Sequence, residues 1–576
     1  MAKKRELELS PVAIDLLENM YLRKDHDGKP IETPEELFCR VAKNVASVEA
    51  NYGIKAKTME RVEEDFYQAM ANLEFLPNSP TLMNAGRELQ QLSACFVLPV
   101  EDSIESIFET IKQAALVHQS GGGTGFSFSH LRPKNDLVRS SGGRSSGPVS
   151  FMRVFDHATE AINQGGFRRG ANMAVLRVDH PDILEFISVK NDGMSLKNFN
   201  ISVGITDAFM EAVEKGGTFD LVNPHTQSVV GNFESRRVMD FIAEMAWRSG
   251  EPGVLFLDRM NARNPTPSLG VIESTNPCGE LPLLPYESCT LGSINLSRLV
   301  ERGQVAMDRM KELVHLGVHF LDNVVDANRY PLPEVERASL GNRKIGLGVM
   351  GLADMLIKLG VPYNSYKALG LIEELMSLFD REASQASVDL AKKRGVFPNF
   401  PLSIYNRPGM PRVRNATRTT IAPTGSLSLI AGCSSGIEPL YALAYQREFH
   451  SATSVFVVHP LFLRTAQEKG FYSEEIIKRL SHRESLRQME DVPEDIKVLF
   501  VTSHDISYDW HVEVQAAFQK HTDNAVSKTI NLPRDASEED VKQAILLAYR
   551  LGCLGITVYR DQSRVQQPLQ ASLKVG

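Results

Sequence analysis

The first 74 residues carry hydrophobic and polar positions at the spacing of amphipathic helices. Pro11 and Pro34 each open a stretch in which apolar residues recur every three or four positions, and Pro is favoured in the first turn of a helix. Thr33, followed three residues later by Glu36, fits a capping box. The pattern breaks at the sequence Phe-Leu-Pro-Asn-Ser-Pro, which begins at Phe75. We therefore predict a helical N-terminal segment over residues 1–74 and a second domain over residues 75–576.

Beyond residue 92, short apolar runs alternate with helical patterns up to the stretch 554–559. Residues 92–100 have the character of a buried strand, and the next stretch, from Asp102, that of a helix with an acidic N-cap. This alternation is typical of α/β proteins, in which helical crossovers join parallel strands. The pattern alone leaves open whether the sheet is closed into a barrel or is open.

Composition excludes several classes of protein. The 576 residues are 43% hydrophobic with 40 Gly, which excludes collagen-like and disordered chains. The net charge of −8 argues against a protein that coats nucleic acid, although small phosphate ligands stay compatible with it. No signal sequence and no run of about 18 apolar residues is present, so we expect no membrane span and a cytoplasmic location. Six cysteines without a CxxC pair predict neither a disulfide framework nor a metal site.

The densest candidate chemistry lies between residues 273 and 296. Asn276, Cys278 and Glu280 alternate with Pro277 and Gly279. If this segment is extended, its period of two directs the three side chains to one side. A thiol between an amide and a carboxylate is a candidate catalytic group. A Cys in such a loop can equally be a small core residue, and the spacing alone leaves both interpretations open.

Asn-Pro-Cys-Gly-Glu at 276–280, followed by a cysteine eleven residues after Cys278, resembles the finger loop of ribonucleotide reductase catalytic subunits. The resemblance covers most of the chain, with further matching motifs at 77–86, 92–99, 422–428 and 555–561. It is greatest to the adenosylcobalamin-dependent class II enzymes of the dimeric type. It implies a ten-stranded α/β barrel of two five-stranded parallel halves, antiparallel to each other, around a central finger loop. The implied activity is reduction of ribonucleotides, with diphosphates as the expected substrates.

This resemblance assigns roles to five side chains. Cys278 matches the thiyl-radical cysteine that abstracts the 3′ hydrogen, Glu280 the base on the 3′ hydroxyl, and Asn276 the amide that holds the substrate hydroxyls. Cys95 and Cys289 match the redox pair, which protonates the departing 2′ hydroxyl and ends as a disulfide. Such a bond requires Cα atoms about 4.4–6.8 Å apart, so the fold must bring the two cysteines together. The other cysteines are expected to be packing residues: Cys39, Cys433 and Cys553.

Two nucleotide sites are also implied. The turn after Pro423 leads from a strand to a helix, whose exposed N–H groups can bind phosphate, although any capped helix looks similar. The implied substrate positions are Ser79, Ala94, Gly123, Thr424, Gly425, Ser426 and Ser428. The implied positions for a deoxynucleoside triphosphate effector are Asp102, Ser103, Ile104 and Arg132, each of which alone fits an ordinary helix cap or surface residue equally well. Gln164 and Arg168, in the loop 164–170, are expected to couple the two sites, and a homodimer is expected.

Class I subunits receive their radical through two adjacent tyrosines near the last barrel strand. Val558 stands beside Tyr559 here, which favours adenosylcobalamin as the cofactor. Two alternatives stay open: a class I catalytic subunit served by a separate radical-generating protein, and a non-catalytic nucleotide sensor. No cysteine follows Cys553, so the family's C-terminal cysteine pair is not found. Either the chain is trimmed, or a thioredoxin-like protein or small dithiol is expected to reduce the redox pair.

Overall fold

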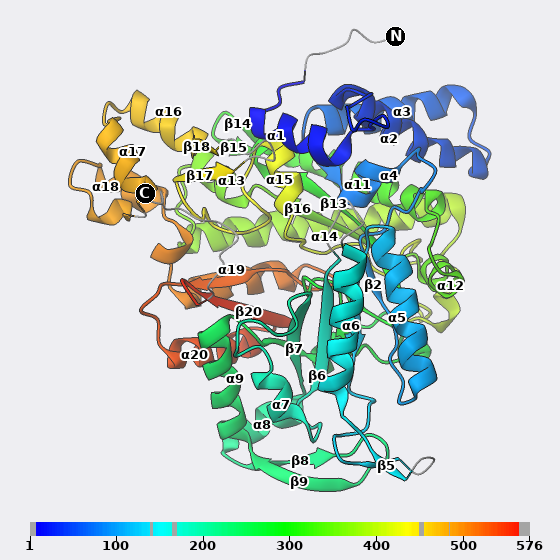
Figure 1. Cartoon of the computed structure of the whole chain (residues 1–576). Coiled ribbons are helices and arrows are strands. Elements are labelled where there is room, and N and C mark those ends of the chain that lie inside the picture. The colour runs from blue at the N-terminus through cyan, green and yellow to red at the C-terminus, as the bar shows by residue number, and fades with distance from the viewer. Residues whose placement is uncertain (1–6, 139–141, 164–169, 449–453, 483, 564–576) are drawn as a thin grey trace.

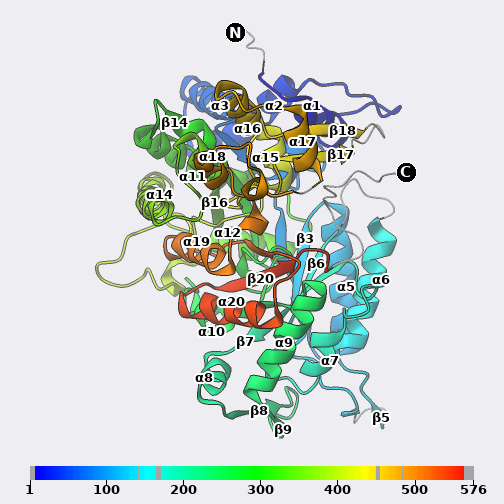
Figure 2. The ribbon, with the colours of Figure 1, turned by 90° about the vertical axis from the view of Figure 1, so that its left-hand side faces the viewer.

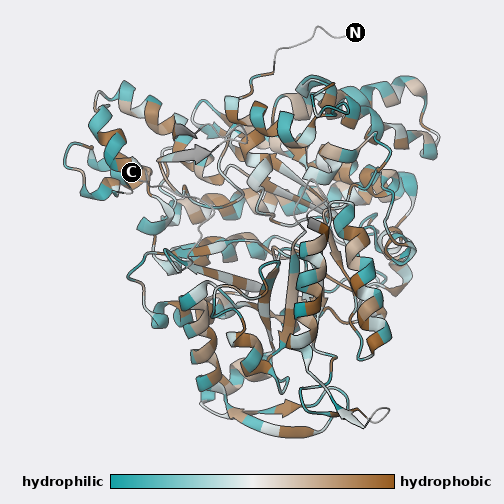
Figure 3. Ribbon diagram, viewed as in Figure 1, coloured by the Kyte–Doolittle hydropathy of each residue, from teal (hydrophilic) through white to brown (hydrophobic). Residues whose placement is uncertain are grey.

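The computed structural model describes residues 7–138, 142–163, 170–448, 454–482 and 484–563. Helices gather at the N-terminal end of the ribbon, and strands run through its centre with further helices outside them (Figures 1 and 2). The helices alternate hydrophobic and hydrophilic stretches along the ribbon, as amphipathic helices do (Figure 3). Within the described part of the chain, no helix has the length and apolar character needed to cross a membrane.

The N-terminal segment is helical, as predicted, with α1 (Pro11–Leu16), α2 (Pro34–Ala46) and α3 (Ala56–Ala71). The capping box is confirmed, because Thr33 Oγ1 accepts from the Glu36 N–H and the Glu36 carboxylate accepts from the Thr33 N–H. Both α2 and α3 contact α11 (Met307–Ala327), which belongs to the later part of the chain. The buried apolar residues of these helices form one cluster with those of later elements, so the N-terminal segment does not pack as a separate body.

One group of strands is parallel throughout. Neighbouring strands pair in chain order, and helices connect most of them, as the alternating pattern predicted. Its members are β2 (Cys95–Val97), β3 (Gly123–Ser127), β6 (Asn172–Arg177), β7 (Phe199–Ile205) and β10 (Gly253–Phe256).

A second group runs in the opposite direction. β13 (Ser288–Asn295) is antiparallel to β2 and to β1 (Phe75–Pro77), and parallel to β16 (Ile345–Met350). At the other edge, β20 (Gly555–Arg560) is antiparallel to β10 and parallel to β19 (Thr529–Leu532). Parallel bridges join Leu347 to Thr419 and Ile421 to Val526, so a segment near residue 420 lies between β16 and the approach to β19.

Helices cover the outer sides of these strands. α5 (Ile104–Gln119) and α6 (Pro148–Asn163) pack together beside the first group, and α11 packs on α14 (Tyr366–Arg394) beside the second. The predicted N-cap of the helix after residue 102 is wrong by one position. Ser103 caps α5 by accepting from the Ser106 N–H, because the Asp102 carboxylate is engaged by Arg132 instead.

The other helices and strands connect or flank these groups. The helices are α4 (Ser79–Asn84), α7 (Ile183–Ser188), α8 (Asp207–Lys215), α9 (Ser235–Ser249), α10 (Leu257–Ala262), α12 (Pro333–Asn342), α13 (Leu352–Lys358), α15 (Gly425–Ala431), α16 (Pro460–Glu468), α17 (Glu474–Ser481), α18 (Glu494–Leu499), α19 (Tyr508–Lys520) and α20 (Glu538–Arg550). The strands are β4 (Leu137–Val138), β5 (Gly143–Arg144), β8 (Thr218–Val222), β9 (Val229–Glu234), β11 (Ser274–Thr275), β12 (Pro282–Leu283), β14 (Val300–Glu301), β15 (Gln304–Val305), β17 (Ala444–Glu448) and β18 (Ser454–Val458).

Candidate active site

The segment that carries Asn276, Cys278 and Glu280 is a hairpin. β11 and β12 pair antiparallel, and the residues between them form a turn, so the condition of an extended segment, under which the three side chains would share one side, is not met. Gly279 takes a φ of +81° and its N–H donates to the Asn276 carbonyl at 3.1 Å, a conformation that glycine adopts without strain. Asn276 and Glu280 are buried at the base of the turn, whereas Cys278 is exposed at its tip.

Glycines in β3 allow this hairpin to lie against the sheet. A Cβ on Gly125 would stand 1.8 Å from the Thr275 carbonyl oxygen, so only glycine fits under the hairpin at that position. On the next strands, the Asn200 side chain donates to the Pro277 carbonyl at 2.8 Å. The Glu280 carbonyl accepts from the Thr420 hydroxyl and the Ala525 N–H, at 2.9 and 3.0 Å. The hairpin is therefore fastened to both groups of strands.

Cys95 and Cys289 lie directly opposite each other on β2 and β13. Opposed residues in an antiparallel ladder have Cα atoms about 4.5–5.5 Å apart, which is within the range that a disulfide bridges. Both thiols are reduced in this structure and both are buried. The fold thus brings together two cysteines far apart in sequence, as the expected redox pair requires.

The remaining members of the predicted set surround Cys95. The Asn276 side-chain amide donates to Cys95 Sγ at 3.1 Å, and its oxygen accepts from the Leu281 N–H at 3.0 Å, which fixes its orientation. Burial, followed by the charges of Glu280 and Cys278, raises the pKa of Cys95 well above its ordinary value. Burial likewise raises the pKa of Cys289. At neutral pH both thiols are therefore protonated.

A cavity of about 330 Å³ opens beside Cys278, between strands β7, β10 and β20. Its polar lining includes Asn200, Tyr441, Lys528 and Tyr559. Lys528 is fully buried, and its Nζ lies 2.7 Å from Glu438 Oε2 and 3.1 Å from His511 Nδ1. Sequence reasoning missed Lys528 and Asn200, because Lys528 directly precedes β19, Asn200 lies within β7, and no local motif marks either residue.

The predicted substrate positions are distributed over several elements. Ser79 opens α4 and lies 2.8 Å from the Tyr21 hydroxyl, and the Ala94 carbonyl accepts from the Gly123 N–H at 2.9 Å. Helix α15 begins at Gly425, so the predicted turn into a helix is confirmed. There Thr424 accepts from the Gly436 N–H and Ser428 donates to the Gly425 carbonyl. Gly425 is exposed and Ser426 is half-buried.

Two of the four predicted effector residues, Asp102 and Arg132, form an ion pair. Arg132 Nε lies 2.7 Å from Asp102 Oδ2, and His225 Nδ1 lies 3.5 Å from the same oxygen. Ser103 is used as the cap of α5, and Ile104 is 62% exposed beside it. Gln164 and Arg168 lie outside the described residues, so the expected coupling loop stays a prediction.

The three other cysteines divide by burial. Cys553 is fully buried and Cys433 is half-buried against the core, as expected of packing residues. Cys39 is exposed on α2, so its expected core position is wrong. It lies near Glu35 and Glu63, whose charges, after partial burial, raise the pKa of its thiol. The apolar residues on either side of Cys39, Phe38 and Val41 among them, supply the buried face of the helix.

The fold and the thiol cluster agree with a family of known enzymes. Residues 7–90 match the all-alpha domain of ribonucleotide reductase, and residues 93–559 match its barrel domain. The chain therefore belongs to the ribonucleotide reductase family.

The names of similar proteins specify the kind of reductase. A protein named vitamin B12-dependent ribonucleoside-diphosphate reductase, from Thermoplasma acidophilum, is 47% identical over 99% of this chain and 81% of its own length. A protein of the same name from Mycobacterium tuberculosis is 48% identical over 98% of this chain and 81% of its own. The structure is similar in fold to the class Id ribonucleotide reductase alpha subunit of Actinobacillus ureae, with a TM-score of 0.79 at 24% identity, covering 97% of this chain and 99% of that one.

Proposed function

We propose that this protein reduces ribonucleotides to 2′-deoxyribonucleotides with adenosylcobalamin as the radical source. One observation carries the proposal: Cys95 and Cys289 oppose each other beneath a hairpin that presents Cys278, with Asn276 and Glu280 buried at its base. The names of the relatives from Thermoplasma and Mycobacterium supply the vitamin B12 dependence and the diphosphate substrate.

Each side chain then has a chemical task. A thiyl radical on Cys278 takes the 3′ hydrogen of the ribose, while Glu280 accepts the 3′ hydroxyl proton. Cys95 gives a proton to the departing 2′ hydroxyl, a role that suits a buried thiol with a raised pKa. Cys95 and Cys289 supply two electrons, so one ribonucleotide and two thiols yield one deoxyribonucleotide, one water and one disulfide. Asn276 aligns the reacting hydroxyls.

The cavity beside Cys278 has the size of the adenosyl group of adenosylcobalamin and not of the whole cofactor. Its volume of about 330 Å³ falls at the lower end of the ~300–1,000 Å³ typical of small-molecule sites. Asn200 and Lys528 offer polar atoms in its wall. When bound, adenosylcobalamin supplies a carbon-centred radical by homolysis of its cobalt–carbon bond. Cys278 lines this cavity, where its sulfur would receive that radical.

We also propose that the two groups of strands close into a ten-stranded barrel of two five-stranded parallel halves. The bridges from Leu347 to Thr419 and from Ile421 to Val526 support closure, because they continue the pairing from β16 to β19. The proposed boundary at residues 74 and 75 is supported by the pairing of β1 with β13, which assigns residue 75 to the sheet.

Regulation and partners complete the proposal. Asp102, Ser103, Ile104 and Arg132 are proposed to bind a deoxynucleoside triphosphate effector at the interface of a homodimer. The exposed apolar side chains of Ile104, Phe108 and Leu116 on α5 support an interface there, because water-exposed apolar area favours association. A thioredoxin-like protein or small dithiol in the cytoplasm is the proposed reductant.

The deciding assay measures deoxynucleoside diphosphate formation from purified protein, adenosylcobalamin and dithiothreitol. We expect product from this mixture without a second protein, and faster turnover of diphosphates than of triphosphates. Product that requires a separate radical-generating subunit would instead indicate a class I catalytic chain. A protein that binds deoxynucleotides with no turnover under either condition would be a nucleotide sensor.

A further inference from the structure

A buried ion pair stands next to the redox cysteines and has no part in the proposed reaction. Lys344 Nζ lies 2.5 Å from Glu287 Oε2, and the two side chains are only 2% and 3% exposed. Glu287 also accepts from the Leu284 N–H at 2.7 Å and from the Asn342 amide at 2.5 Å. Burying two charges has a large desolvation cost, and replacing such pairs by apolar residues is often neutral or stabilising. Stability is therefore a weak reason for their presence.

Strand register places this pair at one end of a row. Cys95 is opposite Gly123 on one side and Cys289 on the other. Thr290 is paired with Ile345, so Lys344 lies one step earlier, beside Cys289. Residues opposite each other on neighbouring strands point to the same face of the sheet. The order across the strands is therefore glycine, Cys95, Cys289, lysine.

The two cysteines consequently differ in their surroundings. Cys95 lies near the Glu280 carboxylate, which opposes negative charge on its sulfur. At Cys289 burial raises the pKa of the thiol. The strongest charge effect there is that of the Lys344 ammonium, which lowers the pKa, and the weaker effects of Glu287 and Glu280 raise it. A nearby cation stabilises a thiolate, and the sulfur that is the better leaving group departs faster in disulfide exchange.

We propose that Lys344, held by Glu287, directs disulfide exchange so that a reductant attacks Cys95 and Cys289 departs as the thiolate. Exchange needs the attacking sulfur, the attacked sulfur and the leaving sulfur nearly in line. An attack on Cys289 would come from the side of Lys344, whereas an attack on Cys95 comes from the side of Gly123, which has no side chain. A Cβ there would meet Pro277 Cγ at 3.1 Å, so the hairpin covers this side closely and the reductant must reach Cys95 past Pro277.

The exchange balances with a dithiol as reductant. Its thiolate forms a bond to Cys95 Sγ while the bond between Cys95 and Cys289 breaks, and the electron pair leaves on Cys289 Sγ. That thiolate then takes a proton from solvent. The second thiolate of the reductant then attacks the reductant sulfur that is bonded to Cys95 Sγ. This closes the reductant's disulfide and releases Cys95 as a thiolate, which takes a second proton. Lys344 keeps its proton throughout, so it is a positioning residue.

The inference rests on the proposed function, and its test begins with one turnover in the absence of reductant. Peptide mapping then establishes whether Cys95 and Cys289 are linked. The oxidised protein is mixed with 2-mercaptoethanol, quenched in acid and mapped again for the mixed disulfide. We expect the adduct on Cys95 with a preference of about tenfold or more over Cys289.

Three variants separate charge from structure. Because Lys344→Met leaves Glu287 buried and unpaired, the double variant Lys344→Met with Glu287→Gln removes both charges together. In it we expect the preference for Cys95 to fall toward parity and reduction by dithiothreitol to slow about tenfold. Lys344→Arg keeps the cation and is expected to retain the preference and a rate within about threefold.

The outcomes distinguish the two proposals. A wild-type adduct on Cys289, or an unchanged preference and rate in the folded double variant, would overturn the inference and leave the proposed function standing. A chain that completes a turnover without linking Cys95 to Cys289 would overturn the proposed function, and the inference with it.

Discussion

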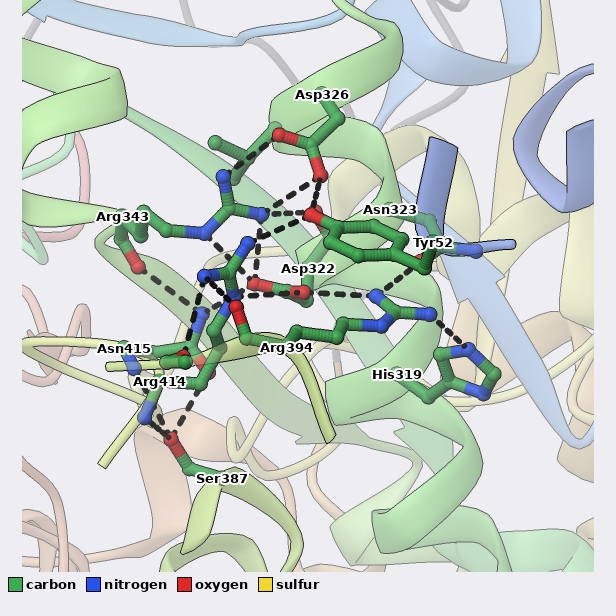
Figure 4. Close-up of polar contacts among 12 residues, drawn as sticks. Tyr52, His319, Asp322, Asn323, Asp326, Arg343, Ser387, Arg394, Arg414 and Asn415 are labelled. Atoms are coloured by element: carbon green, nitrogen blue, oxygen red, sulfur yellow. Dashed lines mark hydrogen bonds and ion pairs between the residues drawn. The ribbon is translucent and has the colours of Figure 1, made fainter. Parts of the chain in front are cut away.

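The structure contains two buried polar regions whose charged groups have different neighbours. In the network of Figure 4, Asp322 is completely buried and meets the guanidinium groups of Arg343, Arg394 and Arg414 at 2.8, 2.9 and 3.4 Å. Around the hairpin, the Glu280 carboxylate instead lies near two buried thiols, Cys95 and Cys289, and raises the pKa of both, although burial raises them more.

The network joins segments from most of the chain. Tyr52, from the N-terminal segment, donates to Asp326 Oδ2 at 2.6 Å and accepts from Arg414 at 2.6 Å. Burial opposes ionisation of Asp322, but the three guanidinium groups lower its pKa to about 2. The charges there are held by opposite charges, which fixes geometry and permits no easy proton transfer.

In the hairpin region, burial keeps the thiols of Cys95 and Cys289 protonated. Thiols with raised pKa values can donate protons, and a carboxylate beside them can accept one. The comparison shows that burial alone does not indicate function. The two regions differ in their chemistry: the network around Asp322 consists of fixed ion pairs, whereas the hairpin region brings thiols and a carboxylate together. The following predictions test that difference.

The largest expected effect comes from the tip of the hairpin. Cys278→Ala should lower deoxynucleotide formation by about 10³-fold or more, because the hydrogen-abstracting sulfur is removed. Cys39→Ala is the matched control, since both cysteines are exposed and only one faces the cavity. Product formation by chromatography and the thermal midpoint of unfolding are the measurements. Turnover by Cys278→Ala near the wild-type rate would refute the radical assignment.

The network should respond in stability. Asp322→Asn leaves three buried guanidinium groups without their shared carboxylate, and removing one partner of a buried ion pair costs about 3–5 kcal/mol. We expect the free energy of unfolding in urea to fall by this amount, while the rate of the folded fraction stays close to wild type. Asp308→Asn is the control, because that side chain is 94% exposed. Equal losses in both variants would contradict the distinction between the two regions.

The sequence alone predicted those features that depend on neighbouring residues or on the spacing of apolar positions. The Thr33 and Glu36 capping box, the N-terminal helices and the alternation of strands and helices follow from neighbouring residues. The cysteine pair was accessible only through resemblance, because the register that opposes Cys95 to Cys289 depends on how distant strands align.

Other features could not be foreseen from residues alone. The alternation of Asn276, Cys278 and Glu280 suggests an extended segment, but Pro277 and Gly279 bend it into a turn that the strands on both sides hold in place. Lys344 directly precedes an apolar strand, a position at which many lysines are exposed. Only the structure shows that its side chain is buried and paired with Glu287, beside Cys289.

A smaller effect is expected at Gly125, the residue of β3 on which the hairpin rests. Gly125→Ala places a Cβ where the Thr275 carbonyl oxygen now lies, so the hairpin must shift outward. Overpacking of this kind costs about 1–3 kcal/mol, and a displacement of about 1 Å at reacting groups can lower turnover up to about 10²-fold. Gly370→Ala, in the open on α14, should leave turnover unchanged. Wild-type turnover in Gly125→Ala would show that the hairpin need not rest on β3.

The smallest expected effect is the loss of stability of the Asp322 network in acid. The folded pKa of Asp322 is about 2, below its ordinary value of 3.8, so the folded state binds fewer protons than the unfolded state between these values. The resulting stability is fully present above about pH 4 and is lost as pH falls toward 2, amounting to about 2 kcal/mol. Glu49, whose pKa is lowered to about 2 against its burial by hydrogen bonds to His319 and Asn323, acts in the same direction. Thermal midpoints measured from pH 5 to pH 2.5 should therefore fall less steeply in Asp322→Asn than in wild type, while Asp308→Asn follows wild type. Parallel curves for all three proteins would mean that the network does not hold Asp322 ionised.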